Sequence, residues 1–108
     1  MDRRAKTYDE FWPVYLAEHR KPGTRRLHLL GTGLALFLLA AAALLREWRL
    51  VPIAVFAGYG FAWLGHAFIE RNRPATFTHP FWSLISDLRM FGLWLAGRLS
   101  TELRRHGL

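Results

Sequence analysis

The sequence of 108 residues contains no cysteine, which excludes a disulfide framework, a thiolate metal site and a cysteine nucleophile. It is also poor in acidic residues, since 8 Asp and Glu stand against 15 Lys and Arg, for a formal net charge of +7. Aromatic residues are plentiful (5 Trp, 8 Phe and 3 Tyr), and this excludes a disordered chain. The length allows one domain at most.

The basic excess is compatible with nucleic acid or with an anionic membrane surface, and the distribution of charge decides between them. Two apolar runs, residues 27–45 and 50–69, separate the charged residues into blocks. Each run would form a helix about 28–30 Å long, which matches the hydrocarbon core of a bilayer, about 30 Å thick. The sequence therefore predicts an integral membrane protein with the lipid bilayer, and no nucleic acid, as its partner.

Lys and Arg are unevenly distributed along this predicted hairpin. Seven precede the first run, two lie in the turn between the runs, and six follow the second run. By the positive-inside rule, both termini are expected in the cytoplasm, which means the inner membrane if the source is bacterial. A cleaved signal peptide is the competing interpretation of the first run. The 26 residues before that run are too many and too acidic for one.

Two further segments flank the hairpin and complete a single membrane domain over residues 1–108. Residues 8–20 place aromatic and aliphatic side chains at spacings of three and four, which predicts an amphipathic helix. Residues 81–97 are helical by pattern, but Asp87 and Arg89 interrupt them, so an interfacial or partly inserted helix is expected. The tail from Arg98 is expected to be exposed. The fold class is all-α: a two-helix transmembrane hairpin with flanking interfacial helices.

Four histidines are predicted to gather at one end of the hairpin. Because a hairpin reverses direction, His28 near the start of the first helix lies beside His66 near the end of the second. His19 and His79 lie just outside the helices on the same side, and Glu70 follows His66 by four residues on the same helical face. Two histidines and a carboxylate form the facial triad of non-haem Fe(II) oxygenases.

His28, His66 and Glu70 are therefore candidate metal ligands, with His19 as a fourth ligand or as an orienting partner. Simpler interpretations stay open. A histidine near a membrane interface also serves as an amphipathic anchor, and Glu70 could pair with one of the arginines that follow it. Those arginines are also explained by the positive-inside rule.

Two stretches of the sequence resemble a known family. From Glu18 the sequence reads EHRKP, followed by Leu27-His28, and the block from Gly65 to Ala75 has the pattern GHxxxExxRPA. Over about residues 8–90 these motifs resemble the 2-hydroxy fatty acid dioxygenase family, which takes part in yeast phytosphingosine breakdown. The chain is similar to the short, bacterial-type members of that family.

The resemblance implies an Fe(II)-dependent membrane dioxygenase of α-oxidation, which shortens a 2-hydroxy fatty acid by one carbon and consumes O₂. It implies His19, His28 and His66 as iron ligands and adds His79 as a further candidate, whereas Glu70 is inferred from spacing. The acid could chelate iron through its carboxylate and hydroxyl while its acyl chain lies in the bilayer. Alternatively an arginine could hold the carboxylate. The candidates for that role are Arg20, Arg71 and Arg73.

Two other functions are weighed against the dioxygenase. One is a b-type haem protein with His28 and His66 as axial ligands from facing helices. The other is a non-catalytic membrane protein that assembles with itself or a partner through small-residue helix faces. Because two spans enclose little space for chemistry, we expect either a homo-oligomer or coverage of the site by residues 8–20 and 81–97.

Overall fold

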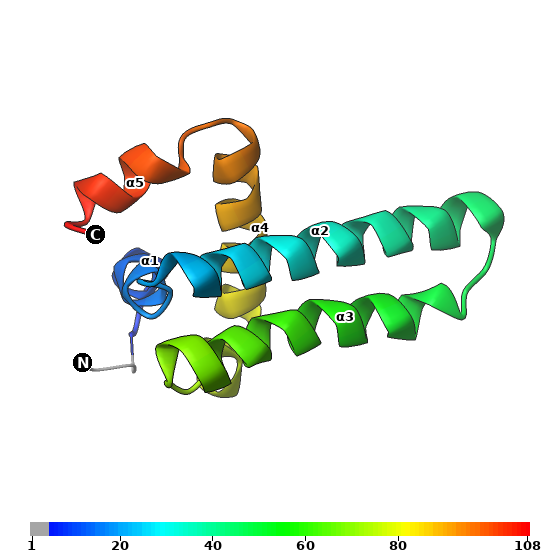
Figure 1. The fold of residues 1–108 in the computed structure, drawn as a ribbon, viewed down its shortest axis with the longest axis horizontal. Coiled ribbons are helices and arrows are strands. Elements are labelled where there is room, and N and C mark those ends of the chain that lie inside the picture. Colours follow the sequence, from blue (N-terminus) through cyan, green and yellow to red (C-terminus); the bar gives the residue numbers. More distant parts are fainter. Residues whose placement is uncertain (1–4) are drawn as a thin grey trace.

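The computed structural model describes residues 5–108, with 78% of the chain in helices and no strand among the described residues (Figure 1). Two long helices, α2 (Pro22–Leu45) and α3 (Leu50–Leu64), form an antiparallel hairpin. The second continues into a π-helical segment, η1 (Gly65–Glu70). The predicted all-α class with an apolar two-helix hairpin is confirmed.

Both arms of the hairpin are long and apolar enough to cross a membrane, with 24 residues in α2 and 21 residues from Leu50 to Glu70. Only 17% and 22% of their most apolar windows are buried within the protein. The helices are therefore not the enclosed core of a soluble fold, because such a core helix would be mostly buried. Large apolar side chains such as Phe37 and Phe56 face outward instead. This surface supports the predicted membrane association.

The first arm begins at Pro22, five residues before the apolar run that predicted it. Proline suits the first position of a helix, since its φ is already helical and its missing N–H would have had no partner. The arm ends at Leu45, and the left-handed backbone of the next residue, Arg46 (φ 52°), turns its N–H back toward the carbonyls of Ala42 and Ala43. A short turn then leads into α3.

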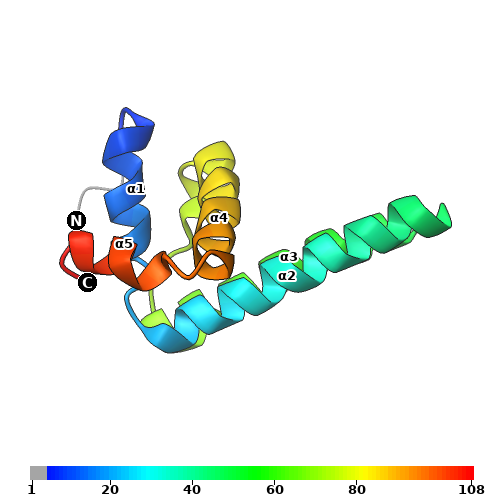
Figure 2. The same ribbon diagram turned by 90° about the horizontal axis from the view of Figure 1, so that it is seen from above.

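The remaining helices gather at the end of the hairpin where α2 begins and η1 ends (Figures 1 and 2). They are α1 (Tyr8–Ala17), α4 (Pro80–Leu95) and α5 (Leu99–Arg105), with a 3₁₀ turn, η2 (Ala75–Phe77), before α4. We refer to these four elements as the helical cap. Apolar side chains from all four form its core: Phe11, Trp12, Tyr15, Leu16, Ala75, Met90, Leu99 and Leu103.

The two flanking helices follow the predicted segments closely, and the tail does not. The buried face of α1 carries the aromatic residues that predicted it. Helix α4 lies across the hairpin and ends before Gly97, whose φ of +71° is the left-handed conformation that commonly terminates a helix (Figure 2). The expectation of an exposed tail after Arg98 is wrong. Leu99 and Leu103, four residues apart, share one face of α5 and bury it against the cap.

Candidate metal centre

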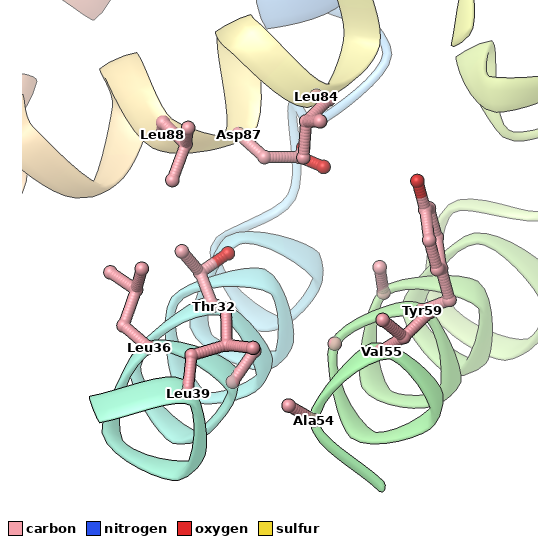
Figure 3. A pocket seen from close by; sticks show the side chains of 12 residues that line it. Thr32, Leu36, Leu39, Ala54, Val55, Tyr59, Leu84, Asp87 and Leu88 are labelled. Carbon is pink, nitrogen blue, oxygen red and sulfur yellow. The ribbon is translucent and has the colours of Figure 1, made fainter. Parts of the chain in front are cut away.

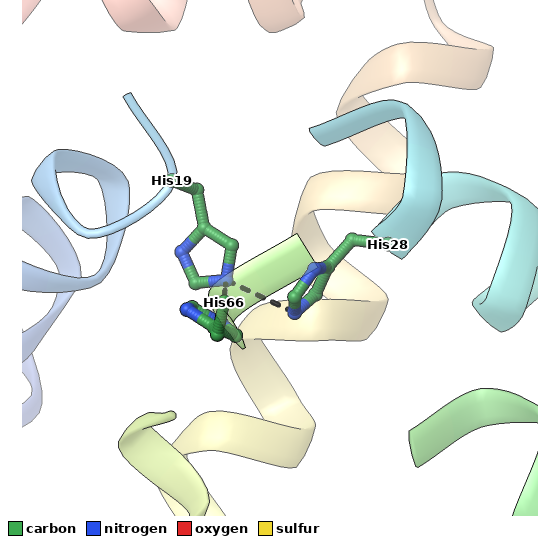
Figure 4. Close-up of side chains that lie close together, drawn as sticks. All are labelled: His19, His28 and His66. Atoms are coloured by element: carbon green, nitrogen blue, oxygen red, sulfur yellow. Dashed lines mark hydrogen bonds between the residues drawn. The ribbon is translucent and has the colours of Figure 1, made fainter. Parts of the chain in front are cut away.

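Three histidines from three segments meet where the cap joins the hairpin (Figure 4). His19 follows α1, His28 lies in the second turn of α2, and His66 lies in η1. All three are at most 4% exposed. Their candidate ligand atoms lie within 4.8 Å of one another, and His19 Nε2 is 3.0 Å from the Nε2 atoms of both other rings. The structure thus brings together the three histidines that the sequence motifs carry.

Close packing of the two hairpin arms sets this geometry. Gly65 lies directly against Thr24, so that a Cβ at Gly65 would lie 3.2 Å from the Thr24 methyl group. Gly31 approaches the Gly58 carbonyl just as closely, since a Cβ there would lie 3.0 Å from that oxygen. Small residues therefore allow the helix ends that bear His28 and His66 to come into contact.

The outer nitrogens of two rings are held by oxygen atoms. His19 Nδ1 donates to the Tyr15 carbonyl at 2.6 Å, and His66 Nδ1 donates to Asn72 Oδ1 at 2.6 Å. The Asn72 amide nitrogen in turn donates to the Glu18 carbonyl, which orients the amide for this role. A carbonyl oxygen only accepts, so both Nδ1 atoms carry a proton and both Nε2 atoms of the neutral rings present lone pairs.

The pKa of His19 supports the neutral form. Burial, followed by the neighbouring His28 and His66 rings, lowers this pKa well below its usual value. Two lone pairs that face each other at 3.0 Å repel unless a proton or a cation lies between them. The centre is therefore built to receive a positive charge.

The spacing of the nitrogens fits a divalent transition-metal ion. Two nitrogens bound at about 2.1 Å in adjacent octahedral positions lie about 3 Å apart, and His19 Nε2 lies at this distance from each of the other two Nε2 atoms. Imidazole suits such ions, and an Nδ1–H bonded to a carbonyl or amide oxygen is the usual support of a metal-binding histidine. The three histidines can therefore hold a metal ion.

Asp87 is a further polar group at this centre, which the sequence marked only as an interruption of α4. Its Oδ1 lies 3.7 Å from His28 Nε2 and accepts a hydrogen bond of 2.5 Å from the Tyr15 hydroxyl. Burial raises the pKa of Asp87 to about 7, although the bond from Tyr15 opposes the shift. Burial and then the Asp87 charge raise the pKa of Tyr15 well above 10, so Tyr15 remains the donor. The sequence held one signal for this role of Asp87, namely an acidic residue in an otherwise apolar helix, because a buried carboxylate requires polar partners.

Two other candidate ligands lie outside the three-histidine group. The Glu70 carboxylate accepts the backbone N–H of Lys21 instead. The prediction for Glu70 assumed an α-helical turn, whereas Gly65–Glu70 is a π-helix. His79 bonds to the Ala5 carbonyl at 3.1 Å and stacks on Trp82 in the cap.

The three arginines proposed for substrate binding lie on the surface at this end of the molecule. Arg20 and Arg71 are exposed, and the exposed Arg73 guanidinium lies over the Phe77 ring, 5.3 Å from its centroid. A different arginine contacts the backbone of the centre itself. Arg25 donates to the carbonyls of His19 and Arg20 and so holds the loop that presents His19.

A buried three-histidine centre at one end of an apolar hairpin defines a membrane-associated protein able to hold a metal ion. Comparison with known families matches residues 5–99 to the family described as 2-hydroxy-palmitic acid dioxygenase Mpo1-like. The match covers most of the chain, so the protein belongs to this family, and the resemblance carried by its histidine motifs is confirmed. No curated protein and no solved structure matches the chain.

Proposed function

We propose that the protein is an Fe(II)-dependent membrane dioxygenase that shortens a 2-hydroxy fatty acid by one carbon in α-oxidation and consumes O₂. The observation that carries the proposal is the convergence of the Nε2 atoms of His19, His28 and His66 in a chain of this family. When bound there, iron would activate O₂ and bind the oxygen atoms of the acid.

The residues around the histidines have distinct roles in this proposal. The Tyr15 carbonyl and the Asn72 amide orient two of the rings, and α1 and α4 exclude water from the centre. Asp87, held by the Tyr15 hydroxyl, faces His28 where it can accept the proton of the substrate's 2-hydroxyl group. Three protein ligands would leave positions open for the substrate.

The distribution of Lys and Arg favours a cytoplasmic location for both termini, and the inner membrane if the source is bacterial. The histidine centre and the three exposed arginines would then lie at the cytoplasmic interface. There the arginines could attract anionic headgroups or the carboxylate of an arriving acid. Because α1 and α4 already bury the centre within one chain, we propose that a monomer suffices and that a homo-oligomer is not required.

The alternatives fit the contacts less well. A haem between His28 and His66 would need the space that the His19 ring occupies, with its centroid 4.2 and 4.5 Å from theirs. Assembly through small residues would need their free faces. Gly31 and Gly58, however, already pack against each other inside the hairpin.

Metal content and oxygen consumption test the proposal together. Protein purified anaerobically in mild detergent should hold near-stoichiometric iron, and His66→Ala should hold none. His106→Ala, directly after α5, is the control and should keep the iron. With 2-hydroxypalmitic acid, the wild type should consume O₂ and release an acid one carbon shorter. A wild-type protein that stays free of iron after Fe(II) is supplied would overturn the proposal.

A further inference from the structure

A groove of about 430 Å³ runs along the hairpin beneath α4 (Figure 3). Leu36 and Leu39 of α2 and Val55 of α3 face Leu84 and Leu88 of α4 across it. Its lining is apolar almost throughout. The groove lies between helices whose outer surfaces are also apolar and exposed, so it would open sideways into the bilayer.

One end of the groove lies next to the histidine centre, and Asp87 connects the two. Asp87 lines the groove, and its carboxylate lies 3.7 Å from His28 Nε2. Thr32, also in the lining, is one helical turn beyond His28, and Ala62 is one turn before His66. Along α2 the lining runs from Thr32 to Leu39, a rise of about 10 Å along the helix axis. One end is therefore polar, and the rest is hydrocarbon.

The volume of the groove indicates what it can hold. A helix about 10 Å across fills a comparable volume in a single turn, so a partner helix does not fit. Small-molecule pockets span about 300–1,000 Å³, and the 430 Å³ here has a lining that extends along both arms of the hairpin. An unbranched hydrocarbon chain with a polar end at Asp87 matches the volume and polarity of this lining.

We propose, building on the proposed function, that this groove binds the acyl chain of the acid substrate. The polar end of the acid lies beside Asp87, and its methyl end lies between Leu39 and Val55. Val55 thereby limits the length of chain that can be accommodated.

The test compares Val55→Phe with Ile53→Phe. Both positions are on α3 two residues apart, and the side chains are 51% and 53% exposed, but only Val55 lines the groove. The probe is 2-hydroxypalmitic acid with a photoreactive diazirine near its methyl end, added to protein in lipid nanodiscs. We expect cross-links near Leu39 that excess unlabelled acid removes. They should fall about tenfold in Val55→Phe and persist in Ile53→Phe.

Oxygen consumption on a series of chain lengths separates the two proposals. Val55→Phe should shift the preference toward shorter acids, whereas Ile53→Phe should keep the wild-type profile. If excess acid removes the cross-links in the groove but no oxygen is consumed, the dioxygenase proposal is wrong and the proposal that the groove binds the acyl chain stands. If both variants consume oxygen with the same chain-length profile, the groove proposal is wrong and the dioxygenase proposal stands. Cross-links that excess acid does not remove, or that spread to Phe56 on the lipid-facing surface, would also overturn the groove.

Discussion

The turn end of the hairpin exposes apolar side chains, whereas the opposite end buries polar ones. At the turn, Leu44, Leu45 and Trp48 are 84%, 72% and 63% exposed. At the other end, His19 and His66 are 1% and 2% exposed, and their Nδ1 atoms donate to the Tyr15 carbonyl and to Asn72 Oδ1. Apolar side chains can remain outside where hydrocarbon surrounds them, whereas polar ones can remain inside only where protein supplies their partners.

The two ends of the hairpin therefore have different structural requirements. The turn end needs only to match the bilayer, and its surface tolerates many apolar residues. The histidine end needs a packed core around it, because three neutral imidazoles without that enclosure would be hydrated and disordered. The helical cap supplies the enclosure through its own buried aromatic residues. Substitutions at the two ends should therefore differ in their cost.

The largest contrast is expected between Trp12→Ala and Trp48→Ala. Trp12 is 3% exposed, donates to Glu102 Oε1 at 3.1 Å and stacks on Tyr15. Its removal leaves a cavity in the cap and should lower the free energy of unfolding by about 3–5 kcal/mol. Trp48→Ala at the exposed turn should change it by less than about 0.5 kcal/mol. Thermal unfolding in detergent, followed by circular dichroism, compares them. Equal losses would mean that the cap is not the main packed core.

Helix contact at the histidine end is tested by Gly31→Ala beside Gly60→Ala. A Cβ at Gly31 would lie 2.9 Å from Phe61 Cβ, whereas at Gly60 nothing lies within 4 Å. The first substitution should separate the arms and cost about 1–3 kcal/mol. The second should be neutral or gain up to about 1 kcal/mol from helix propensity. The same unfolding assay measures both, and a stable Gly31→Ala protein would contradict the close contact.

A substitution outside the three histidines should lower the metal affinity of the centre without abolishing metal binding. Asn72→Ala removes the acceptor for His66 Nδ1, and loss of such a support lowers metal affinity about 10–100-fold. Glu70→Gln should leave the affinity unchanged, because its carboxylate serves the Lys21 N–H. Competition of the Fe(II)-loaded protein with a chelator measures both. A larger loss of iron affinity in Glu70→Gln than in Asn72→Ala would indicate that Glu70 is a metal ligand.

Much of this arrangement could be predicted from the sequence. The apolar runs and the turn between them determine that His28 and His66 lie at the same level, because a hairpin permits no other alignment. The aromatic spacing in residues 8–20 likewise predicted which face of α1 is buried. These features depend only on local periodicity and chain reversal.

The rest depends on tertiary geometry. Asp87 reaches His28 because α4 crosses the hairpin at that point, and Asn72 reaches His66 because the loop after η1 folds back. Neither arrangement follows from spacing. The bond between the Glu70 carboxylate and the Lys21 N–H likewise does not follow from the spacing, and Glu70 as a ligand stays a prediction.

The smallest effect is expected from Glu102, which holds the edge of the cap. Its carboxylate accepts hydrogen bonds from Trp12 and His106, with Arg105 on its own helix and Arg89 of α4 nearby. The hydrogen bond from Trp12, followed by the bond from His106 and the positive charges, lowers the pKa of Glu102 below its usual value. Glu102→Gln keeps an acceptor for Trp12 but removes the charge, which should cost less than about 1 kcal/mol at pH 7.

The dependence of this difference on pH identifies the charge as its source. Because the pKa of Glu102 is lower in the folded state, its contribution is complete above the usual pKa of 4.5 and is lost as the pH falls through the folded value. Wild type and Glu102→Gln should therefore differ in unfolding at pH 7 and converge in acid. Glu47→Gln at the turn is the control. Its partner Arg49 is only two residues away, so the pair also forms in the unfolded chain and contributes little at any pH. A difference that persists unchanged in acid would assign the role of Glu102 to packing rather than to charge.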